Sequence, residues 1–120
     1  MNKRRAMVVD DYPSNCLLAA ALLERLGWRV TEANSGEAAL DAANAEQFEL
    51  VLLDISMPGL SGEETCKRLR EGAHGNNMRI LAYTAHAYPE EKARFLAAGF
   101  DDILVKPIDR PAFEALIGQV

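Results

Sequence analysis

Hydrophobic positions along the chain fall into two alternating patterns. Five short runs are rich in aliphatic and β-branched residues, and the first, third and fourth runs are continuous rather than alternating. Short continuous apolar runs are typical of strands that are covered on both faces of a sheet. The predicted strands are Ala6–Val9, Arg29–Thr31, Leu50–Leu53, Arg79–Tyr83 and Ile103–Val105.

Each predicted strand is followed by an amphipathic segment that predicts a helix. Leu18, Leu22 and Leu26 recur at helical spacing, and we expect this stripe to face the core. Gly27 is the expected stop of that helix. The other helices are indicated by the stripe Ala39, Leu40 and Ala43, a capping box at Ser61 and Glu64 in which both side chains would accept amides, Pro89 with a stop at Gly99, and a segment from about Asp109 with Phe113, Leu116 and Ile117.

The order strand–helix occurs five times and uses nearly all of the chain. Strands separated by helices form parallel sheets with right-handed crossovers, and the helices must then cover both faces. We therefore expect an α/β fold, a doubly wound five-stranded parallel sheet with helices on both faces. Residues 1–120 are expected to form one domain.

Charge and composition narrow the class of protein. The 120 residues carry 13 Lys and Arg against 18 Asp and Glu, a net charge of −5, which argues against direct nucleic-acid binding. No apolar stretch approaches the roughly 18 residues of a membrane span, and none suits a signal peptide. Cys16 and Cys66 form no disulfide framework, so we expect buried, inert thiols and a reducing, cytoplasmic compartment.

Polar residues whose side chains could bind a ligand or react follow four of the five predicted strands. Asp10 and Asp11 follow the first strand, and Asp54, Thr84 and Lys106 follow the third, fourth and fifth. Ligands of doubly wound sheets bind outside the carboxyl ends of the strands, so we expect these side chains to converge. Three close carboxylates repel one another, and Mg²⁺, which prefers oxygen ligands and retains waters, would offset that repulsion.

The same set of side chains suits phosphoryl chemistry. A carboxylate can act as a nucleophile and form an aspartyl phosphate, and phosphoryl transfer depends mainly on charge neutralisation and positioning. Lys106 and Thr84 would supply a cation and a hydroxyl donor for the phosphoryl oxygens. Each residue alone has an ordinary interpretation as a turn, cap or surface residue. One site that uses all of these residues explains their position at four strand ends better than four separate interpretations do.

The ordered motifs Asp10-Asp11, Asp54, Thr84 and Lys106-Pro107 on this strand–helix chain resemble the receiver domain of bacterial response regulators. The motifs around the acidic pair and Thr84 are most similar to receivers attached to hybrid sensor histidine kinases. The resemblance implies a flavodoxin-like (βα)5 fold and Asp54 as phosphoacceptor, with Thr84 and Lys106 on the phosphoryl oxygens. A histidine kinase or a histidine phosphotransfer protein would be the partner.

The resemblance also implies a metal site and a backbone feature. Asp11 and Asp54 would ligate Mg²⁺ directly with the backbone carbonyl of Ser56, while Asp10 would act mainly through a metal-bound water. The bond before Pro107 is expected to be cis and to aim the lysine into the site. By the same resemblance the protein would catalyse its own phosphorylation and slow dephosphorylation, without being a turnover enzyme.

The expected switch departs from the family pattern at one position. Receivers often carry Tyr or Phe three residues before the lysine, and this chain has Ile103. Phosphorylation would still draw Thr84 inward and reshape the surface around the fourth helix and fifth strand. His86 is expected near the site rim, where it either tunes hydrolysis or is an ordinary partly exposed loop residue, and His74 is given no role. We expect no membrane contact, and a weak homodimer remains an option.

Three other functions compete with a phosphorylated receiver. A Mg²⁺-dependent phosphohydrolase of the haloacid-dehalogenase kind would need a second Asp two residues after its nucleophile, where Asp54 has Ser56 and Asp11 has Pro13. A flavodoxin-like FMN binder would need a phosphate-binding loop after the first strand instead of two acids. A degenerate receiver that only binds partners would normally have lost a site residue, and none is lost here.

Overall fold

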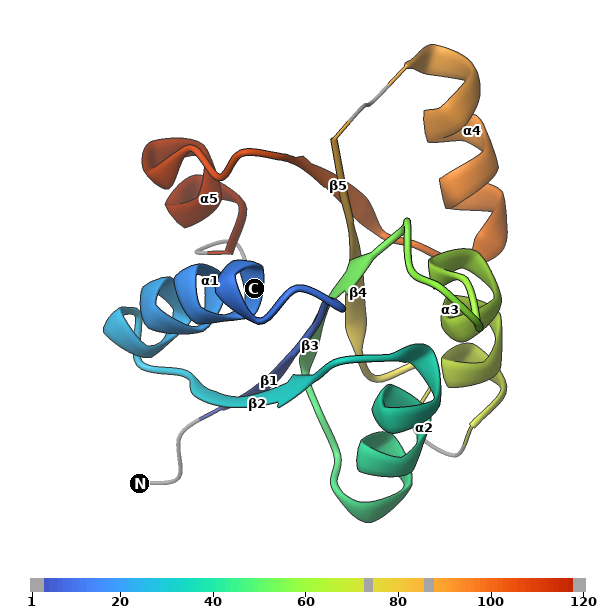
Figure 1. The fold of residues 1–120 in the computed structure, drawn as a ribbon, viewed down its shortest axis with the longest axis horizontal. Coiled ribbons are helices and arrows are strands. Elements are labelled where there is room, and N and C mark those ends of the chain that lie inside the picture. The colour runs from blue at the N-terminus through green and yellow to red at the C-terminus, as the bar shows by residue number, and fades with distance from the viewer. Residues whose placement is uncertain (1–3, 73–74, 86–87, 118–120) are drawn as a thin grey trace.

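Five parallel strands form one sheet in the order β2-β1-β3-β4-β5 (Figure 1). The computed structural model describes residues 4–72, 75–85 and 88–117, so His74 and His86 lie outside the described residues. Each strand begins and ends within two residues of its prediction. The strands are β1 (Arg5–Val9), β2 (Arg29–Ala33), β3 (Leu50–Asp54), β4 (Arg79–Thr84) and β5 (Asp102–Val105).

Helices cover both faces of this sheet, as Figure 1 shows. Within the described ranges, no helix has the length and apolar character needed to cross a membrane. One face carries α1 (Pro13–Arg25) and α5 (Arg110–Ile117), and the other carries α2 (Gly36–Ala45), α3 (Gly62–Glu71) and α4 (Pro89–Ala98). The expected α/β class with a doubly wound, five-stranded parallel sheet is confirmed.

Alternating strand residues fill two separate cores. In β1, Met7 and Val9 pack on the side of α2, α3 and α4, whereas Ala6 and Val8 pack on the side of α1 and α5. Successive side chains of a strand point to opposite faces, so a central strand must be apolar throughout. All five residues of β3 are buried, which explains why its hydrophobic run is continuous.

The predicted apolar stripe of α1 was wrong at two of its three positions, since only Leu22 packs in part against the core. Leu18 and Leu26 are 50% and 41% exposed. The buried residues of α1 are Cys16, Ala19, Ala20 and Leu23. These positions also follow helical spacing, and the small alanine side chains allow the helix to lie close to the sheet. Leu18 and Leu26 therefore remain toward solvent, although they belong to the most visible hydrophobic pattern of the sequence.

The other helices begin and end largely as predicted. Half of the expected capping box forms, because Ser61 Oγ accepts the backbone N–H of Glu64 at 3.2 Å. The other half does not match the prediction, since the Glu64 carboxylate accepts from Arg68 Nε at 3.2 Å. Gly99 follows α4 with a φ of 114°, a left-handed conformation that glycine adopts without steric cost.

Arg70, near the end of α3, links several loops at the amino-terminal edge of the sheet through hydrogen bonds. Its Nε donates to the carbonyl oxygen of Gly99 at 2.9 Å, and its Nη1 donates to those of Gly75 and Met78 at 2.6 and 2.7 Å. Its Nη2 donates to Asp101 Oδ2 at 2.6 Å. This guanidinium therefore ties α3 to the loop before β4 and to the turn before β5.

Both cysteines are buried and unlinked, as expected. Burial is the main cause that raises the pKa of each thiol to about 11. The thiolate is the reactive form of cysteine, so both side chains are chemically quiet near neutral pH.

Candidate active site

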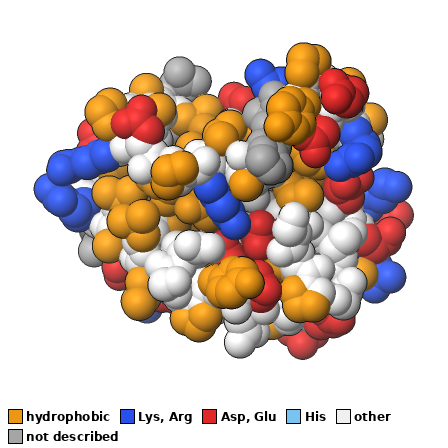
Figure 2. Space-filling view, turned by 45° about the horizontal axis from the view of Figure 1, so that its top comes forward, with side chains coloured by type: hydrophobic (Ala, Val, Ile, Leu, Met, Phe, Trp, Pro, Cys, Tyr) orange, Lys and Arg blue, Asp and Glu red, His pale blue; other side chains and the backbone are white. Residues whose placement is uncertain are grey.

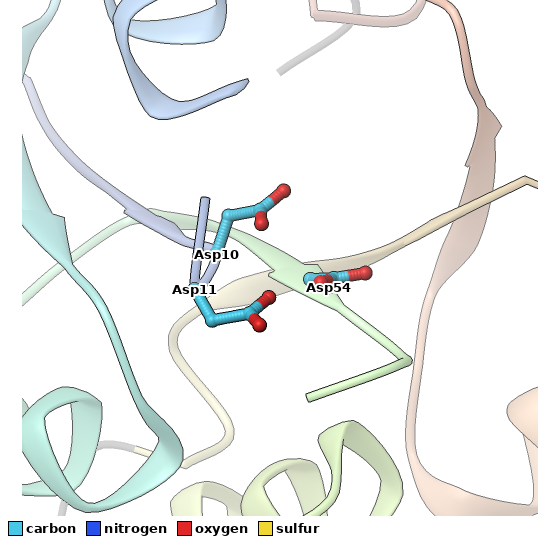
Figure 3. A group of neighbouring side chains, drawn as sticks. All are labelled: Asp10, Asp11 and Asp54. Atoms are coloured by element: carbon cyan, nitrogen blue, oxygen red, sulfur yellow. The ribbon is translucent and has the colours of Figure 1, made fainter. Parts of the chain in front are cut away.

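Three carboxylates meet at the carboxyl-terminal edge of the sheet. Asp10 and Asp11 directly follow β1, and Asp54 is the last residue of the neighbouring strand β3. One oxygen from each of the three lies within 4.8 Å of the others, and the side chains point into the same space (Figure 3). Asp10 is fully buried, Asp54 is 2% exposed and Asp11 is half-buried. The predicted convergence of these acids is confirmed.

Local backbone contacts hold two of these acids in place. Asp10 Oδ1 accepts the backbone N–H of Tyr12 at 2.9 Å, and Asp54 Oδ1 accepts that of Ser56 at 3.3 Å. Such turns are formed by short acidic side chains that bond to the amide two residues later. Gly62, the first residue of α3, packs so tightly behind β3 that a Cβ there would collide with the carbonyl oxygen of Asp54.

Lys106 is the cation of the site. Its Nζ lies 3.1 Å from Asp54 Oδ1 and 3.4 Å from Asp10 Oδ2, with 22% of the side chain exposed. Burial alone would lower the pKa of Lys106, but the hydrogen bond and charge of Asp54 and the charge of Asp10 outweigh burial and raise it. The lysine is therefore protonated at neutral pH and compensates part of the negative charge of the acids.

The acidic charge is not fully compensated. Burial raises the pKa of Asp54, and the charge of Asp10 adds to this rise against the opposing hydrogen bond from Lys106. Asp10 Oδ2 and Asp11 Oδ1 are buried and have no hydrogen-bond partner among the residues that the structure describes. Buried carboxylate oxygens without hydrogen bonds are costly, and one ammonium faces three acids, so this cluster is suited to an additional cation.

The donor set fits Mg²⁺. All three side chains offer hard oxygen ligands, and two of the oxygens accept no hydrogen bond from the part of the chain that the structure describes. Mg²⁺ is usually bound by one or two carboxylates together with waters and phosphate oxygens, rather than by a complete protein cage. Residues Asp10, Asp11 and Asp54 would hold the ion here.

The remaining predicted residues lie around this cluster. Thr84 ends β4, is 7% exposed and accepts the backbone N–H of Lys106 at 2.7 Å through its carbonyl oxygen. Ser56 is exposed in the loop after β3. The Lys106–Pro107 peptide bond is cis, as predicted. Ile103 is half-buried against the core beneath α2, α3 and α4.

One contributor had no predicted role. Tyr83 was assigned only to the fourth strand, yet Lys106 Nζ lies 4.7 Å from the centroid of its ring. The sequence offered one signal for a role of Tyr83: it is an aromatic residue near the end of a central strand, directly before the site threonine. Period-two alternation would have placed that ring on the opposite face of the sheet from Thr84.

The surface around the site is chemically mixed. Figure 2 shows acidic side chains beside a basic one near the middle of one face, with hydrophobic side chains gathered next to them. The exposed large hydrophobic residues include Tyr12, immediately after the acidic pair, and Leu17 in α1. A second macromolecule that reached the acids would therefore meet apolar as well as charged surface.

Known proteins resemble this chain in sequence. Residues 6–118 match the family model of the response regulator receiver domain. Sensor histidine kinase GacS of Pseudomonas protegens is 43% identical over 107 residues, 87% of this chain and 12% of that protein. Virulence sensor protein BvgS of Bordetella pertussis is 43% identical over 120 residues, 96% of this chain and 10% of that protein. The chain thus spans only a small part of the length of these relatives.

Solved structures resemble it in fold. Chemotaxis protein CheY4 of Vibrio cholerae superimposes with a TM-score of 0.93 at 28% identity, covering 99% of both chains. The receiver domain of sensor histidine kinase PA1611 of Pseudomonas aeruginosa, solved with a magnesium ion in its active site cleft, gives 0.88 at 29% identity over 98% of this chain and 97% of that one. None of the relatives named here is a phosphohydrolase of the haloacid-dehalogenase kind. With sequence, fold and acidic edge in agreement, the chain belongs to the response regulator receiver domain family of two-component phosphorelay signalling.

Proposed function

We propose that Asp54 accepts a phosphoryl group from a partner phosphohistidine in a Mg²⁺-dependent reaction. The observation that carries this proposal is the placement of Asp54, buried beside two other acids and 3.1 Å from the ammonium of Lys106. Asp54 ends a central strand and lies nearer the lysine ammonium than Asp10 does, at 3.1 against 3.4 Å. An oxygen of Asp54 would form the new bond to phosphorus as the bond from phosphorus to the imidazole nitrogen breaks.

The other site residues have distinct proposed roles. Asp11, Asp54 and the backbone carbonyl of Ser56 would hold the metal directly, with Asp10 acting mainly through a water. Mg²⁺, when bound, would neutralise the carboxylates and withdraw charge from the phosphoryl oxygens. Lys106 would exchange part of its carboxylate contact for a phosphoryl oxygen, and the Thr84 hydroxyl would donate to another.

The phosphoryl group would act as a switch through added charge. An aspartyl phosphate carries more negative charge and more acceptor oxygens than the carboxylate it replaces. We expect Thr84 to move inward and the surface formed by α4 and β5 to change its partner affinity. Ile103 would take part through packing rather than through a rotating aromatic ring, because it carries neither ring nor hydroxyl.

The partner follows from the chemistry of the donor. A histidine kinase or a histidine phosphotransfer protein would present the phosphohistidine. Both sequence relatives named above are sensor proteins, and one of them is a histidine kinase by name. Residues 1–120 would act as one receiver unit in the cytoplasm, without direct nucleic-acid contact. The self-phosphorylation and slow dephosphorylation of Asp54 would be the only chemistry of the unit.

Acetyl phosphate tests the proposal without a partner protein. The purified chain, mixed with acetyl phosphate and Mg²⁺ and weighed intact, is expected to gain the mass of one phosphoryl group. EDTA or Asp54→Asn should abolish the gain. Asp41→Asn is the matched control, because Asp41 is an exposed acid on α2 and should leave the gain intact. Failure of the wild type to gain mass, or a gain that survives Asp54→Asn, would refute the assignment.

A further inference from the structure

Tyr83 lies directly against the ammonium group of the site lysine. Lys106 Nζ is 4.7 Å from the centroid of the Tyr83 ring, within the range in which a cation is attracted to the face of an aromatic ring. Tyr83 is only 2% exposed, so little water competes with this contact. The ring thus joins the carboxylates of Asp54 and Asp10 as a described contact of the ammonium.

Packing in the core between the sheet and helices α1 and α5 holds the Tyr83 ring in place. Tyr83 pairs in register with Asp54 on one side and with Leu104 on the other. Its side chain belongs to the core between the sheet and helices α1 and α5, together with Leu104 and Phe113. Burial, followed by the charges of Asp10 and Asp54, raises the pKa of Tyr83 to about 12, so the ring stays neutral at physiological pH.

The ring approaches Lys106 from the face of the sheet opposite to Ile103. Ile103 packs against the core beneath α2, α3 and α4, whereas Tyr83 packs in the core beneath α1 and α5. The contact with the lysine therefore does not depend on the position where receivers often carry an aromatic switch residue. It comes from the residue that immediately precedes Thr84.

A lysine needs such support most when its carboxylate partners are engaged elsewhere. The lysine side chain is long, flexible and strongly hydrated, and its geometry is set by the groups around it. When a cation and a phosphoryl group occupy the site, Asp10 and Asp54 have other partners and hold the ammonium less strongly. The Tyr83 ring cannot leave, because the surrounding core fixes it.

We propose that Tyr83 is a positioning residue for Lys106, whose ring keeps the ammonium at the phosphoryl site while Asp54 reacts. This inference rests on the proposed phosphorylation of Asp54 for its kinetic consequence, but the ring–ammonium contact does not. The hydroxyl has no part in it, so phenylalanine should serve as well as tyrosine, whereas an apolar side chain without a ring should not.

A double-mutant cycle measures the kinetic consequence. The rate of phosphoryl mass gain at saturating acetyl phosphate and Mg²⁺ is compared for wild type, Tyr83→Phe, Tyr83→Leu, Lys106→Met and the double variant Tyr83→Leu with Lys106→Met. Tyr83→Leu is expected to slow the reaction roughly tenfold, and Tyr83→Phe should stay within about twofold of wild type. In the Lys106→Met background Tyr83→Leu should add no further loss. An equal loss in both backgrounds, or no loss in Tyr83→Leu, would overturn the proposal.

A spectroscopic test is independent of phosphorylation, and its decisive reading comes from the wild type alone. Protons on the Lys106 Cε should be shifted upfield by the ring current of Tyr83 in the NMR spectrum of the metal-free wild type. The shift should persist in Tyr83→Phe and disappear in Tyr83→Leu. Unshifted Lys106 Cε protons in wild type would overturn the proposal. If the shift is present but wild type gains no phosphoryl group, the contact stands and the proposed function fails.

Discussion

The two edges of the sheet each contain a partly buried cation. At the amino-terminal edge, all three guanidinium nitrogens of Arg70 donate hydrogen bonds. At the carboxyl-terminal edge, the single ammonium of Lys106 faces three carboxylates. Arg70 donates to three carbonyl oxygens and to Asp101, and Asp101 Oδ2 also accepts the backbone N–H of Ile80 at 2.8 Å. Lys106 meets two of three acids, and buried oxygens of Asp10 and Asp11 are left without hydrogen bonds among the described residues.

The two edges of the sheet therefore have different tasks: one contributes to stability, and the other is suited to binding a ligand. A buried charge with complete hydrogen bonding holds neighbouring elements together, whereas a buried charge with incomplete pairing destabilises the free protein. The second arrangement leaves binding free energy available to a ligand that supplies the missing charge. We therefore expect the amino-terminal edge to contribute stability and the carboxyl-terminal edge to gain it on binding Mg²⁺.

The largest expected effect is the loss of the Arg70 network. Arg70→Met removes the guanidinium donor of three carbonyl oxygens and leaves Asp101 with only the Ile80 amide among the described contacts, and the free energy of unfolding should fall by about 4 kcal/mol. Urea unfolding followed by circular dichroism measures it. Arg68→Met is the matched control on the same helix, because the Arg68 side chain is 53% exposed and forms a surface ion pair with Glu64, so its loss should cost less than about 1 kcal/mol. Equal losses would contradict the contrast between the two edges.

The core between α1 and the sheet should contribute stability through apolar packing rather than through the hydrogen bonds of a charged group. Leu23→Ala removes a fully buried side chain from the core that α1 shares with the sheet and should cost about 3 kcal/mol. Leu18→Ala, on the exposed side of the same helix, should cost less than about 1 kcal/mol. The same urea titration separates them, and a larger cost for Leu18→Ala would restore the stripe predicted from the sequence.

Mg²⁺ should stabilise the acidic edge by mass action. At a concentration ten times its dissociation constant, Mg²⁺ is expected to raise the free energy of unfolding by about 1.4 kcal/mol and to raise the melting temperature. Thermal unfolding in Mg²⁺ and in EDTA measures this increment. Asp11→Asn should reduce it strongly, and Arg68→Met, at the far end of the sheet, should retain it. Superimposable melting curves of wild type in the two conditions would exclude a preformed site.

The smallest expected effect is the pH dependence that Asp54 introduces. Because burial raises its pKa in the folded state, the folded protein holds this proton more tightly than the unfolded chain, whose aspartate pKa is near 3.8. Without metal, stability contributed by Asp54 therefore falls as pH rises from below 3.8 through the raised pKa. Asp54→Asn should remove this fall and be more stable than wild type by about 1 kcal/mol at pH 7.

The control for this pH effect is Asp41→Asn, which removes an exposed acid of α2. Urea titrations in EDTA at several pH values between 4 and 8 compare the three proteins. The Asp54→Asn curve should separate from wild type as pH rises, while the Asp41→Asn curve should run parallel to it. A parallel Asp54→Asn curve would mean that Lys106 fully compensates the buried charge.

The amino-acid sequence determined the class of fold and the identity of the acids at the site. Continuous apolar runs mark strands buried on both faces, and parallel strands bring their carboxyl ends to one edge, so the positions of Asp10, Asp11 and Asp54 followed from order alone. Lys106 and Thr84 could be placed by the same rule. Local periodicity and chain order are sufficient for this because neither depends on detailed packing.

Only the tertiary structure decided which contacts these residues make. Two helical stripes overlap in α1, and the one that is buried contains the alanines that permit a close approach to the sheet. The bond between Lys106 and Asp54 joins residues 52 positions apart and depends on strand register, as does the ring of Tyr83 beneath the ammonium. Arg70 binds mostly backbone carbonyl oxygens, which every residue carries and which no sequence pattern can reveal.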